Sequence, residues 1–179
     1  LDLLETFGPP WVLITLSTSP QPGDTTIVKT ALKPLASMNV RVLVTLAPGH
    51  DKGGLGRIPD NVLVAGYIPH SKVLPHCRLV ISHAGHGIVM KAMTYGIPMV
   101  LVPWGRDQPG VAARALRLGT ATVVPRDRCT VDVLAAAIGE ALNDPGYLQR
   151  SRFVSRRLGR MDGVTKAVRQ IETFLDNRS

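Results

Sequence analysis

Apolar residues gather along this chain in short runs that are rich in β-branched side chains. Short apolar runs without polar alternation are typical of strands buried on both faces of a parallel sheet. They predict strands at residues 11–16, 40–46, 61–65, 79–81, 97–102 and 120–124. The segments between them carry apolar residues at helical spacing. They predict helices from Asp24 to about Met38, over a short stretch from Ser71, from 88 to 95, from Asp107 to Leu118, from Thr130 to Leu142, from Tyr147 to Arg160 and from Val164 to Leu175.

Strands that alternate with helices in this way indicate a parallel sheet with right-handed crossovers and helices on both faces. We therefore predict an α/β fold, a Rossmann-like doubly wound parallel sheet of about six strands. The 179 residues suit one domain that is large enough to bury a substantial core.

The stretch from Val80 to Pro103 has the most specific pattern in the chain. A buried strand is followed by a turn of small and polar residues, Ser82 to Gly87, and then by a helical segment that ends at Gly96. The next strand begins near Pro98, where a missing N–H group is tolerated. This order predicts one βαβ unit whose glycines lie at the entrance of its helix.

Such a helix entrance favours the binding of an anion. The first N–H groups of a helix have no partner within the helix, and the aligned peptide dipoles leave partial positive charge there. Gly85 and Gly87 allow backbone to approach a phosphate closely, and the imidazole of His83 can donate a hydrogen bond to it. A lone Gly-x-Gly would be weak evidence for a phosphate site.

A second polar pair, Asp107 and Gln108, follows the next predicted strand. Ligands of open α/β sheets bind outside the carboxyl ends of the strands, so this pair and the glycine turn are expected to face one site. An Asp at the start of a helix is usually only a cap, and that alternative stays open for Asp107.

Four motifs together resemble the nucleotide-sugar signature of the UDP-glycosyltransferase superfamily. They are His83-Ala-Gly-His-Gly87, Gly96-Ile-Pro-Met-Val, Pro103-x-x-x-Asp-Gln108, and Ala112-Ala-Arg114 with Gly119. They are especially similar to the bacterial macrolide and antibiotic glycosyltransferases of GT-B fold. The resemblance runs from about Trp11 to Leu175, and it matches only the C-terminal, donor-binding half of such enzymes.

The resemblance implies a role for each part of a nucleotide-sugar site. The base is expected on Tyr67, whose ring offers stacking area at low entropy cost, and on the backbone of Ile68. The diphosphate-binding residues implied are Thr18, His83, Gly85, His86, Gly87 and Ile88. Asp107 and Gln108 are expected to hold the sugar. The alternatives are that Tyr67 packs beneath a loop and that Thr18 lies in an ordinary loop.

The resemblance also implies how the chain is organised. Residues 1–10, with two adjacent prolines, are expected to end an interdomain linker, and residues 11–179 to form the donor-binding domain. Because the chain begins with Leu and matches one half of the family, we expect a fragment without the N-terminal acceptor domain. The family sends a terminal helix across to the partner domain. The helix at 164–175 is expected either to pack on its own domain or to expose an apolar stripe.

Three residues depart from the family pattern. Ile88 stands where a phosphate-binding Thr or Ser is common, so only its backbone N–H is left for the ligand. Lys91 stands where plant relatives place a ribose-binding Glu, and Val111 replaces a frequent Asn. We expect a donor affinity below the family norm.

The net charge of +8 raises the possibility of nucleic-acid binding. Arginines are concentrated in the predicted helices after residue 149, but aromatic residues make up only 4% of the chain and do not alternate with basic ones. We therefore favour a solvated helix face or a surface for another domain, and expect no nucleic-acid partner.

Other function classes fit less well. The five histidines form no His-x-x-x-His pair and have no carboxylates clustered with them, so we expect no metal site. A Gly-x-Ser-x-Gly elbow and an activated cysteine motif are missing, which disfavours covalent hydrolysis. Residues 17–23 do not fit the dinucleotide fingerprint, which disfavours a nicotinamide dehydrogenase.

Composition bears on the compartment as well. Two cysteines without a spacing motif suggest a reducing compartment, and no run approaches the roughly 20 apolar residues that span a bilayer. We expect a cytoplasmic protein without a membrane span.

The function implied by resemblance is the nucleotide-diphosphate-sugar binding half of a hexosyltransferase. Such an enzyme transfers a hexose from a UDP- or dTDP-sugar to a small lipophilic acceptor without a metal or another cofactor. Its catalytic base lies in the missing half, so we expect this chain to bind donor without catalysing transfer. The alternative is a degenerate or truncated nucleotide-binding or interaction module. A nucleotide-sugar epimerase or a cell-wall N-acetylglucosaminyltransferase of GT-B fold fits the Asp-Gln pair and the Tyr-Ile-Pro loop less well.

Overall fold

The computed structural model describes residues 8–16, 23–50 and 53–176. Six strands form one sheet in the order β3-β2-β1-β4-β5-β6, and every neighbouring pair is parallel. The strands are β1 (Trp11–Thr15), β2 (Arg41–Thr45), β3 (Val62–Ala65), β4 (Cys77–Ser82), β5 (Met99–Leu101) and β6 (Ala121–Val123). The predicted doubly wound parallel sheet is confirmed.

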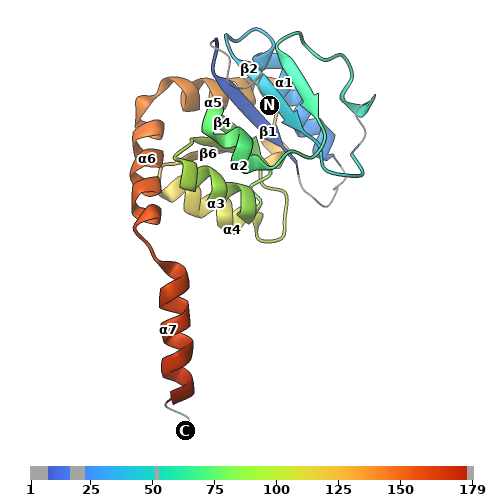
Figure 1. Cartoon of the computed structure of the whole chain (residues 1–179). Helices are drawn as coiled ribbons and strands as arrows, with labels where there is room; N and C mark the ends of the chain where they lie inside the picture. The colour runs from blue at the N-terminus through green and yellow to red at the C-terminus, as the bar shows by residue number, and fades with distance from the viewer. Residues whose placement is uncertain (1–7, 17–22, 51–52, 177–179) are drawn as a thin grey trace.

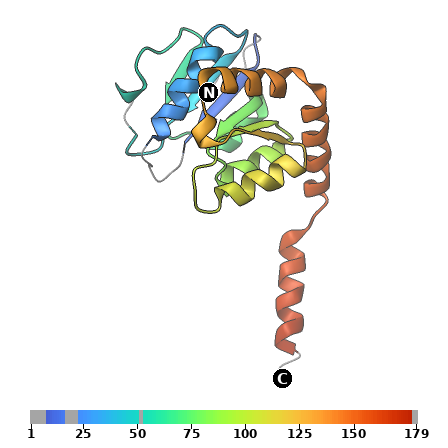
Figure 2. The same cartoon turned by 180° about the vertical axis from the view of Figure 1, so that it is seen from behind.

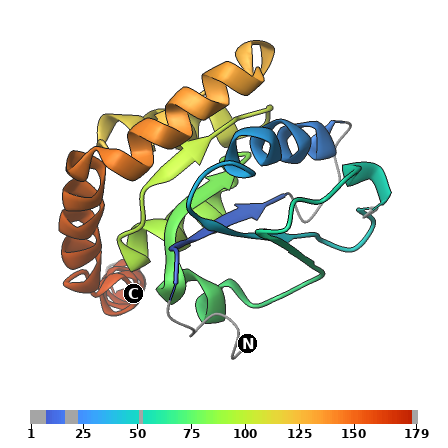
Figure 3. The ribbon, with the colours of Figure 1, turned by 90° about the horizontal axis from the view of Figure 1, so that it is seen from above.

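Helices cover both faces of this sheet (Figure 1, Figure 3). They are α1 (Asp24–Leu35), α2 (His70–Val73), α3 (His86–Tyr95), α4 (Gln108–Arg117), α5 (Val131–Asn143), α6 (Pro145–Gly159) and α7 (Gly163–Asp176). Short 3-10 helices lie at η2 (Gly53–Leu55), η3 (Leu74–His76) and η4 (Arg126–Arg128).

The core consists of two apolar layers, one on each side of the sheet. In one layer α1 and α5 pack on the strands, with Val28, Leu35 and Ile138 fully buried. In the other layer η3, α3 and α4 supply residues such as Leu74, Ala92 and Ala115. The central strands are buried on both faces, which is why their sequences read as continuous apolar runs.

The strand order fixes where a ligand site can form. From β1 the sheet grows towards β2 and β3 on one side, and towards β4, β5 and β6 on the other. The connections on the two sides therefore diverge between β1 and β4, and the carboxyl ends of these two strands border a crevice where open α/β sheets bind ligands.

Asp24, Ser71 and Thr130 begin three predicted helices and are residue types that favour the N-cap position, but of these three only Thr130 is an N-cap. Gly23, not Asp24, is the N-cap of α1, with a left-handed backbone (φ 88°) that glycine adopts without strain. The α2 helix begins at His70 after Pro69, two residues earlier than a Ser71 cap implies, because the Lys72 N–H already bonds the Pro69 carbonyl at 3.0 Å. Thr130 does cap α5, accepting a hydrogen bond from the Val133 N–H.

The last helix leaves the body of the domain. α6 packs beside α3, and α7 then projects away from the sheet (Figure 1, Figure 2). None of the α7 residues is buried. Its apolar side chains form the exposed stripe that was one of the two sequence alternatives: Val164, Val168, Ile171, Phe174 and Leu175. In the described ranges, no helix combines the length and the apolar character needed to cross a membrane.

Candidate functional site

Three hydroxyl side chains end the central strands at the carboxyl edge of the sheet. Thr15 of β1 lies in register with Thr45 of β2 on one side and with Ser82 of β4 on the other. All three are buried. The Ser82 hydroxyl accepts a hydrogen bond of 3.2 Å from the Ala84 N–H, so it fixes the turn that leads into α3.

The turn after β4 is tightly constrained. Ala84 adopts a left-handed φ of 65° and is fully buried, which redirects the chain from the strand into α3. His83 is only 8% exposed. A Cβ atom on Gly85 would lie 2.7 Å from Nε2 of His83, so the imidazole lies against the backbone of Gly85 at the helix entrance.

The entrance of α3 presents free backbone donors. Gly85 is the N-cap and supplies no side-chain hydrogen bond, and the first intrahelical bond runs from the Val89 N–H to the Gly85 carbonyl. The N–H groups of His86, Gly87 and Ile88 precede that bond and, among the residues that the structure describes, are the unpaired donors of a helix start. A Cβ on Gly87 would meet nothing within 4 Å, so space is open above this turn. An anion fits this arrangement.

Ile88 has a structural role in this turn. Its side chain is buried in the apolar layer beneath α3, so it faces the core and not the helix entrance. Lys91 lies one turn further along and is exposed.

Asp107 and Gln108 lie at the start of α4, after β5. Gln108 is 6% exposed, and its Oε1 accepts hydrogen bonds from the N–H groups of Trp104 (2.8 Å) and Gly105 (3.3 Å). This pairing leaves the Nε2 end of the amide as a donor. The exposed carboxylate of Asp107 makes no capping hydrogen bond to α4. This argues against the alternative that Asp107 serves only as a helix cap.

Tyr67 and Ile68 follow β3 at the same edge of the sheet. The Tyr67 side chain is 77% exposed, so it does not pack beneath a loop. Ile68 is half-buried against the apolar layer of α2 and α3. The arrangement offers a free aromatic face beside an anchored backbone.

His70 is a candidate that the sequence interpretation missed. Its Nε2 lies 3.3 Å from the Thr15 hydroxyl, which connects the segment after β3 with the carboxyl end of β1. Burial, and secondarily the positive charge of Lys91, lowers the pKa of this imidazole. The position of His70, three residues after Tyr67 and next to a strand end, was the available signal.

Comparison with known proteins then places the chain in a family. Residues 29–159 match the model of the erythromycin biosynthesis protein CIII-like C-terminal domain. The chain belongs to this family. Over 174 residues it is 32% identical to O-mycaminosyltylonolide 6-deoxyallosyltransferase of Streptomyces fradiae, covering 96% of this chain and 40% of that protein. The predicted resemblance to macrolide glycosyltransferases is confirmed.

Solved structures agree on the fold of this CIII-like domain. The calicheamicin glycosyltransferase CalG4 superposes with a TM-score of 0.83 at 24% identity, over 96% of this chain and 44% of its own. The glycosyltransferase VinC in complex with dTDP gives a TM-score of 0.83 at 22% identity, over 99% of this chain and 44% of its own. The chain spans about two fifths of the length of the curated relatives it matches.

The described part of the CIII-like domain brings most predicted site residues to one edge of the sheet. His83 to Ile88, Tyr67 with Ile68, and Asp107 with Gln108 all follow carboxyl ends of strands. Thr18 lies outside the described residues. Within the described ranges, no group of three or more His, Cys, Asp or Glu side chains is placed to hold a metal ion.

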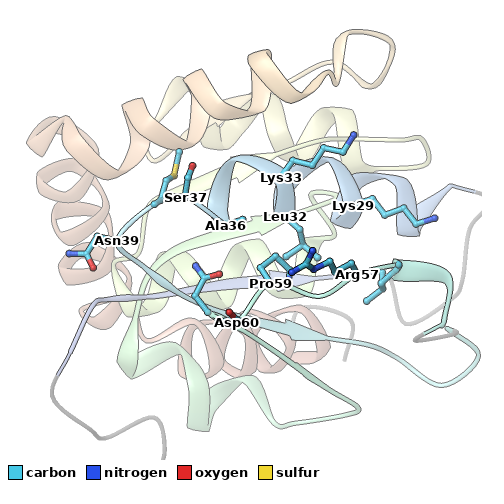
Figure 4. A pocket seen from close by; sticks show the side chains of 13 residues that line it. Lys29, Leu32, Lys33, Ala36, Ser37, Asn39, Arg57, Pro59 and Asp60 are labelled. Atoms are coloured by element: carbon cyan, nitrogen blue, oxygen red, sulfur yellow. The ribbon is translucent and has the colours of Figure 1, made fainter.

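A cavity of about 880 Å³ lies elsewhere in the CIII-like domain, between α1 and residues 55–61. Lys29, Lys33 and Arg57 line it, together with Asp60 and the apolar Leu32 (Figure 4). Its lining residues 37–39 and 59–61 directly precede β2 and β3, so it lies towards the amino ends of these strands. It is therefore separate from the site at the carboxyl edge.

Proposed function

We propose that this chain is the nucleotide-sugar binding half of a glycosyltransferase. The observation that carries the proposal is the anion-binding entrance of α3, where His83 lies against Gly85 beside open space. A diphosphate there would meet backbone N–H groups, the helix dipole and an imidazole donor. Membership in the CIII-like family supports the same conclusion.

Each part of a nucleotide sugar has a matching surface along this edge. The base would stack on the exposed ring of Tyr67 and pair with the backbone of Ile68. The diphosphate would lie over His83 to Ile88, with Thr18 as a further proposed contact. The sugar hydroxyls would donate to the carboxylate of Asp107 and accept from Nε2 of Gln108.

The donor is proposed to be a UDP- or dTDP-hexose and the acceptor a small lipophilic molecule. The structure of VinC with dTDP supports a pyrimidine diphosphate. The name of the Streptomyces fradiae relative, a deoxyallosyltransferase acting on a tylonolide, supports a hexose and a lipophilic acceptor. No metal or other cofactor is part of the proposal, nor is nucleic acid. We place the protein in the cytoplasm.

The chemistry divides between two halves. Hydrogen-bond donors fixed around the diphosphate stabilise the negative charge that grows on it as the sugar departs. The acceptor hydroxyl needs a base within hydrogen-bond reach, and we propose that an N-terminal acceptor domain supplies it. We therefore expect this chain alone to bind donor and to transfer no sugar.

One observation favours a second candidate, a nucleotide-binding module that has lost transferase function. The side chain of Ile88 is committed to the core, so this position offers the diphosphate no hydroxyl. A domain of this kind would bind weakly and discriminate poorly between donors.

Calorimetric titration of the chain with UDP, dTDP and GDP tests the proposal. We expect micromolar binding of a pyrimidine diphosphate that falls at least tenfold in His83→Ala, as for a lost charge-assisted hydrogen bond. His76→Ala is the matched control, because His76 lies in η3 before β4, at the opposite edge of the sheet. Equal binding of all three nucleotides would favour the degenerate module, and binding of none would overturn the proposed function.

A further inference from the structure

The indole of Trp104 is held between two other loops of the carboxyl edge. The guanidinium carbon of Arg126 lies 3.3 Å from the centroid of the indole ring, a close cation–π stack. On α1, a Cβ placed on Gly23 would collide with the far edge of the same ring. The ring therefore lies against the bare backbone of Gly23 and beneath the planar face of Arg126.

Stacking, not hydrogen bonding, holds this ring. Nε1 of Trp104 is buried and has no hydrogen-bond partner among the residues that the structure describes. The indole packs in part against the apolar layer of α1 and α5. The contacts with Gly23 and Arg126 thus determine where Trp104 lies.

The backbone of Trp104 is in turn tied to the proposed sugar-binding pair. Its N–H donates to Oε1 of Gln108 at 2.8 Å, and the Gln108 N–H donates to the Gly105 carbonyl at 3.2 Å. Arg106, within this loop, adopts a left-handed φ of 57°, an uncommon conformation that its surroundings must maintain. A loop of this shape presents Asp107 only while its ends stay fixed.

Three connections meet at this ring. Gly23 opens α1 after β1, Trp104 follows β5, and Arg126 lies in η4 after β6. All three follow carboxyl ends of strands, and the indole joins the connection after β6 to residues 104–108.

We propose that Arg126 is a positioning residue for the donor sugar. By stacking on Trp104 it holds the loop that presents Asp107 and Gln108, and it needs no contact with the ligand. This inference rests on the proposed function and names a residue outside the proposed site. It predicts that Arg126 affects the affinity for the sugar portion of the donor and not the affinity for the nucleotide diphosphate.

The test compares UDP with UDP-glucose and dTDP with dTDP-glucose, by calorimetry on the unaltered chain and on Arg126→Ala. The dissociation constant of the nucleotide divided by that of the nucleotide sugar isolates the contribution of the sugar. We expect Arg126→Ala to lower that ratio about three- to fivefold, the size of one cation–π contact, while binding of the nucleotide alone changes less than about twofold. Arg126→Lys keeps a cation but loses the planar stack, and should recover part of the ratio.

Arg128→Ala is the matched control, because Arg128 is an exposed arginine of the same 3-10 helix. A spectroscopic readout accompanies the titration. The chain has two tryptophans, so a Trp11→Phe background leaves Trp104 as the sole reporter. Removing the guanidinium of Arg126 should shift the fluorescence emission of Trp104.

The possible results distinguish a failure of this inference from a failure of the proposed function on which it rests. If the unaltered chain binds neither nucleotide nor nucleotide sugar, both are overturned. If it binds and Arg126→Ala leaves the ratio unchanged while the Trp104 emission shifts, the stack is only structural and the inference alone fails. Equal losses for nucleotide and nucleotide sugar overturn it as well.

Discussion

The imidazole of His83 occupies the space that a side chain on Gly85 would need. Nε2 of His83 would lie 2.7 Å from a Cβ at position 85, closer than real Cβ contacts come. Gly85 has an ordinary extended backbone, with φ −60° and ψ 137°, so glycine is required here for space and not for conformation. The ring and the helix entrance form one unit, in which neither partner can change alone.

Gly85→Ala should therefore displace His83 and damage both stability and diphosphate binding. We expect a loss of about 1–3 kcal/mol in the free energy of unfolding, as for overpacking at a closely packed site. Urea unfolding measures it, and calorimetry with UDP and dTDP measures the loss of affinity. Gly87→Ala is the control, because its Cβ would meet nothing within 4 Å, and alanine there should stabilise α3 by roughly 0.5–1 kcal/mol. Two variants of equal stability would contradict the close contact.

Asp107→Asn should separate sugar binding from folding. Because the Asp107 carboxylate makes no capping bond to α4, its loss should change the unfolding free energy by less than about 0.5 kcal/mol. Hydrogen bonds to a charged group contribute about 1.5–3 kcal/mol, so UDP-glucose or dTDP-glucose should bind at least tenfold more weakly. Thr130→Ala, which removes an observed cap from α5, should cost about 1 kcal/mol instead. Comparable destabilisation by both variants would show that Asp107 is a cap after all.

Gly23→Ala should destabilise the fold for two independent reasons. The left-handed φ of 88° is unfavourable for alanine, and the added methyl would meet the indole of Trp104. We expect a loss of about 1–3 kcal/mol and a change in Trp104 fluorescence. A Cβ on Gly139, within α5, would meet nothing within 4 Å, so Gly139→Ala should be neutral or stabilising. It is the reference variant against which the thermal melt of Gly23→Ala is compared.

The lowered pKa of His70 makes stability depend on pH in a defined direction. Above the ordinary histidine pKa of about 6.5 the imidazole is neutral in both the folded and the unfolded chain, and its contribution is complete. As the pH falls from there towards the lower folded pKa, the unfolded chain takes up the proton first and stability declines. Histidine NMR titration and denaturant unfolding at several pH values measure both effects.

Lys91→Gln provides the internal comparison for this titration. It removes the secondary cause, the nearby positive charge, but leaves the burial of His70 in place. The pKa of His70 should rise towards its ordinary value without reaching it, and the acid-induced loss of stability should shrink. An unchanged pKa would mean that burial alone determines this titration.

The fold was predictable because its strands are buried on both faces and therefore appear in the sequence as uninterrupted apolar runs. The prediction that the candidate site residues follow the carboxyl ends of the strands came from the same βαβ pattern. Gly23 shows where such inference ends. Gly23 is the N-cap of α1, and a side chain at this position would meet the indole of Trp104, a neighbour 81 residues away. Local capping propensity favours Asp24 as the N-cap and contains no information about the contact with Trp104.

The same limit applies to His70 and Arg126. The contact of His70 with Thr15 and the stack of Arg126 on Trp104 each join segments far apart in sequence. A pattern of apolar spacing describes which face a residue occupies and not which side chain lies opposite. Tyr67 is the converse case, since only the structure could decide between a packed and an exposed ring.

The projection of α7 away from the sheet has a consequence for how the chain opens. A helix of 14 residues with no buried side chain is close to the length at which isolated helices are marginal in water. Its amide protons should exchange with solvent within seconds or faster, long before those of the buried β1 and β4, which open only with global unfolding. Brief proteolysis should accordingly remove this helix and leave the sheet, the entrance of α3 and the stack on Trp104 intact.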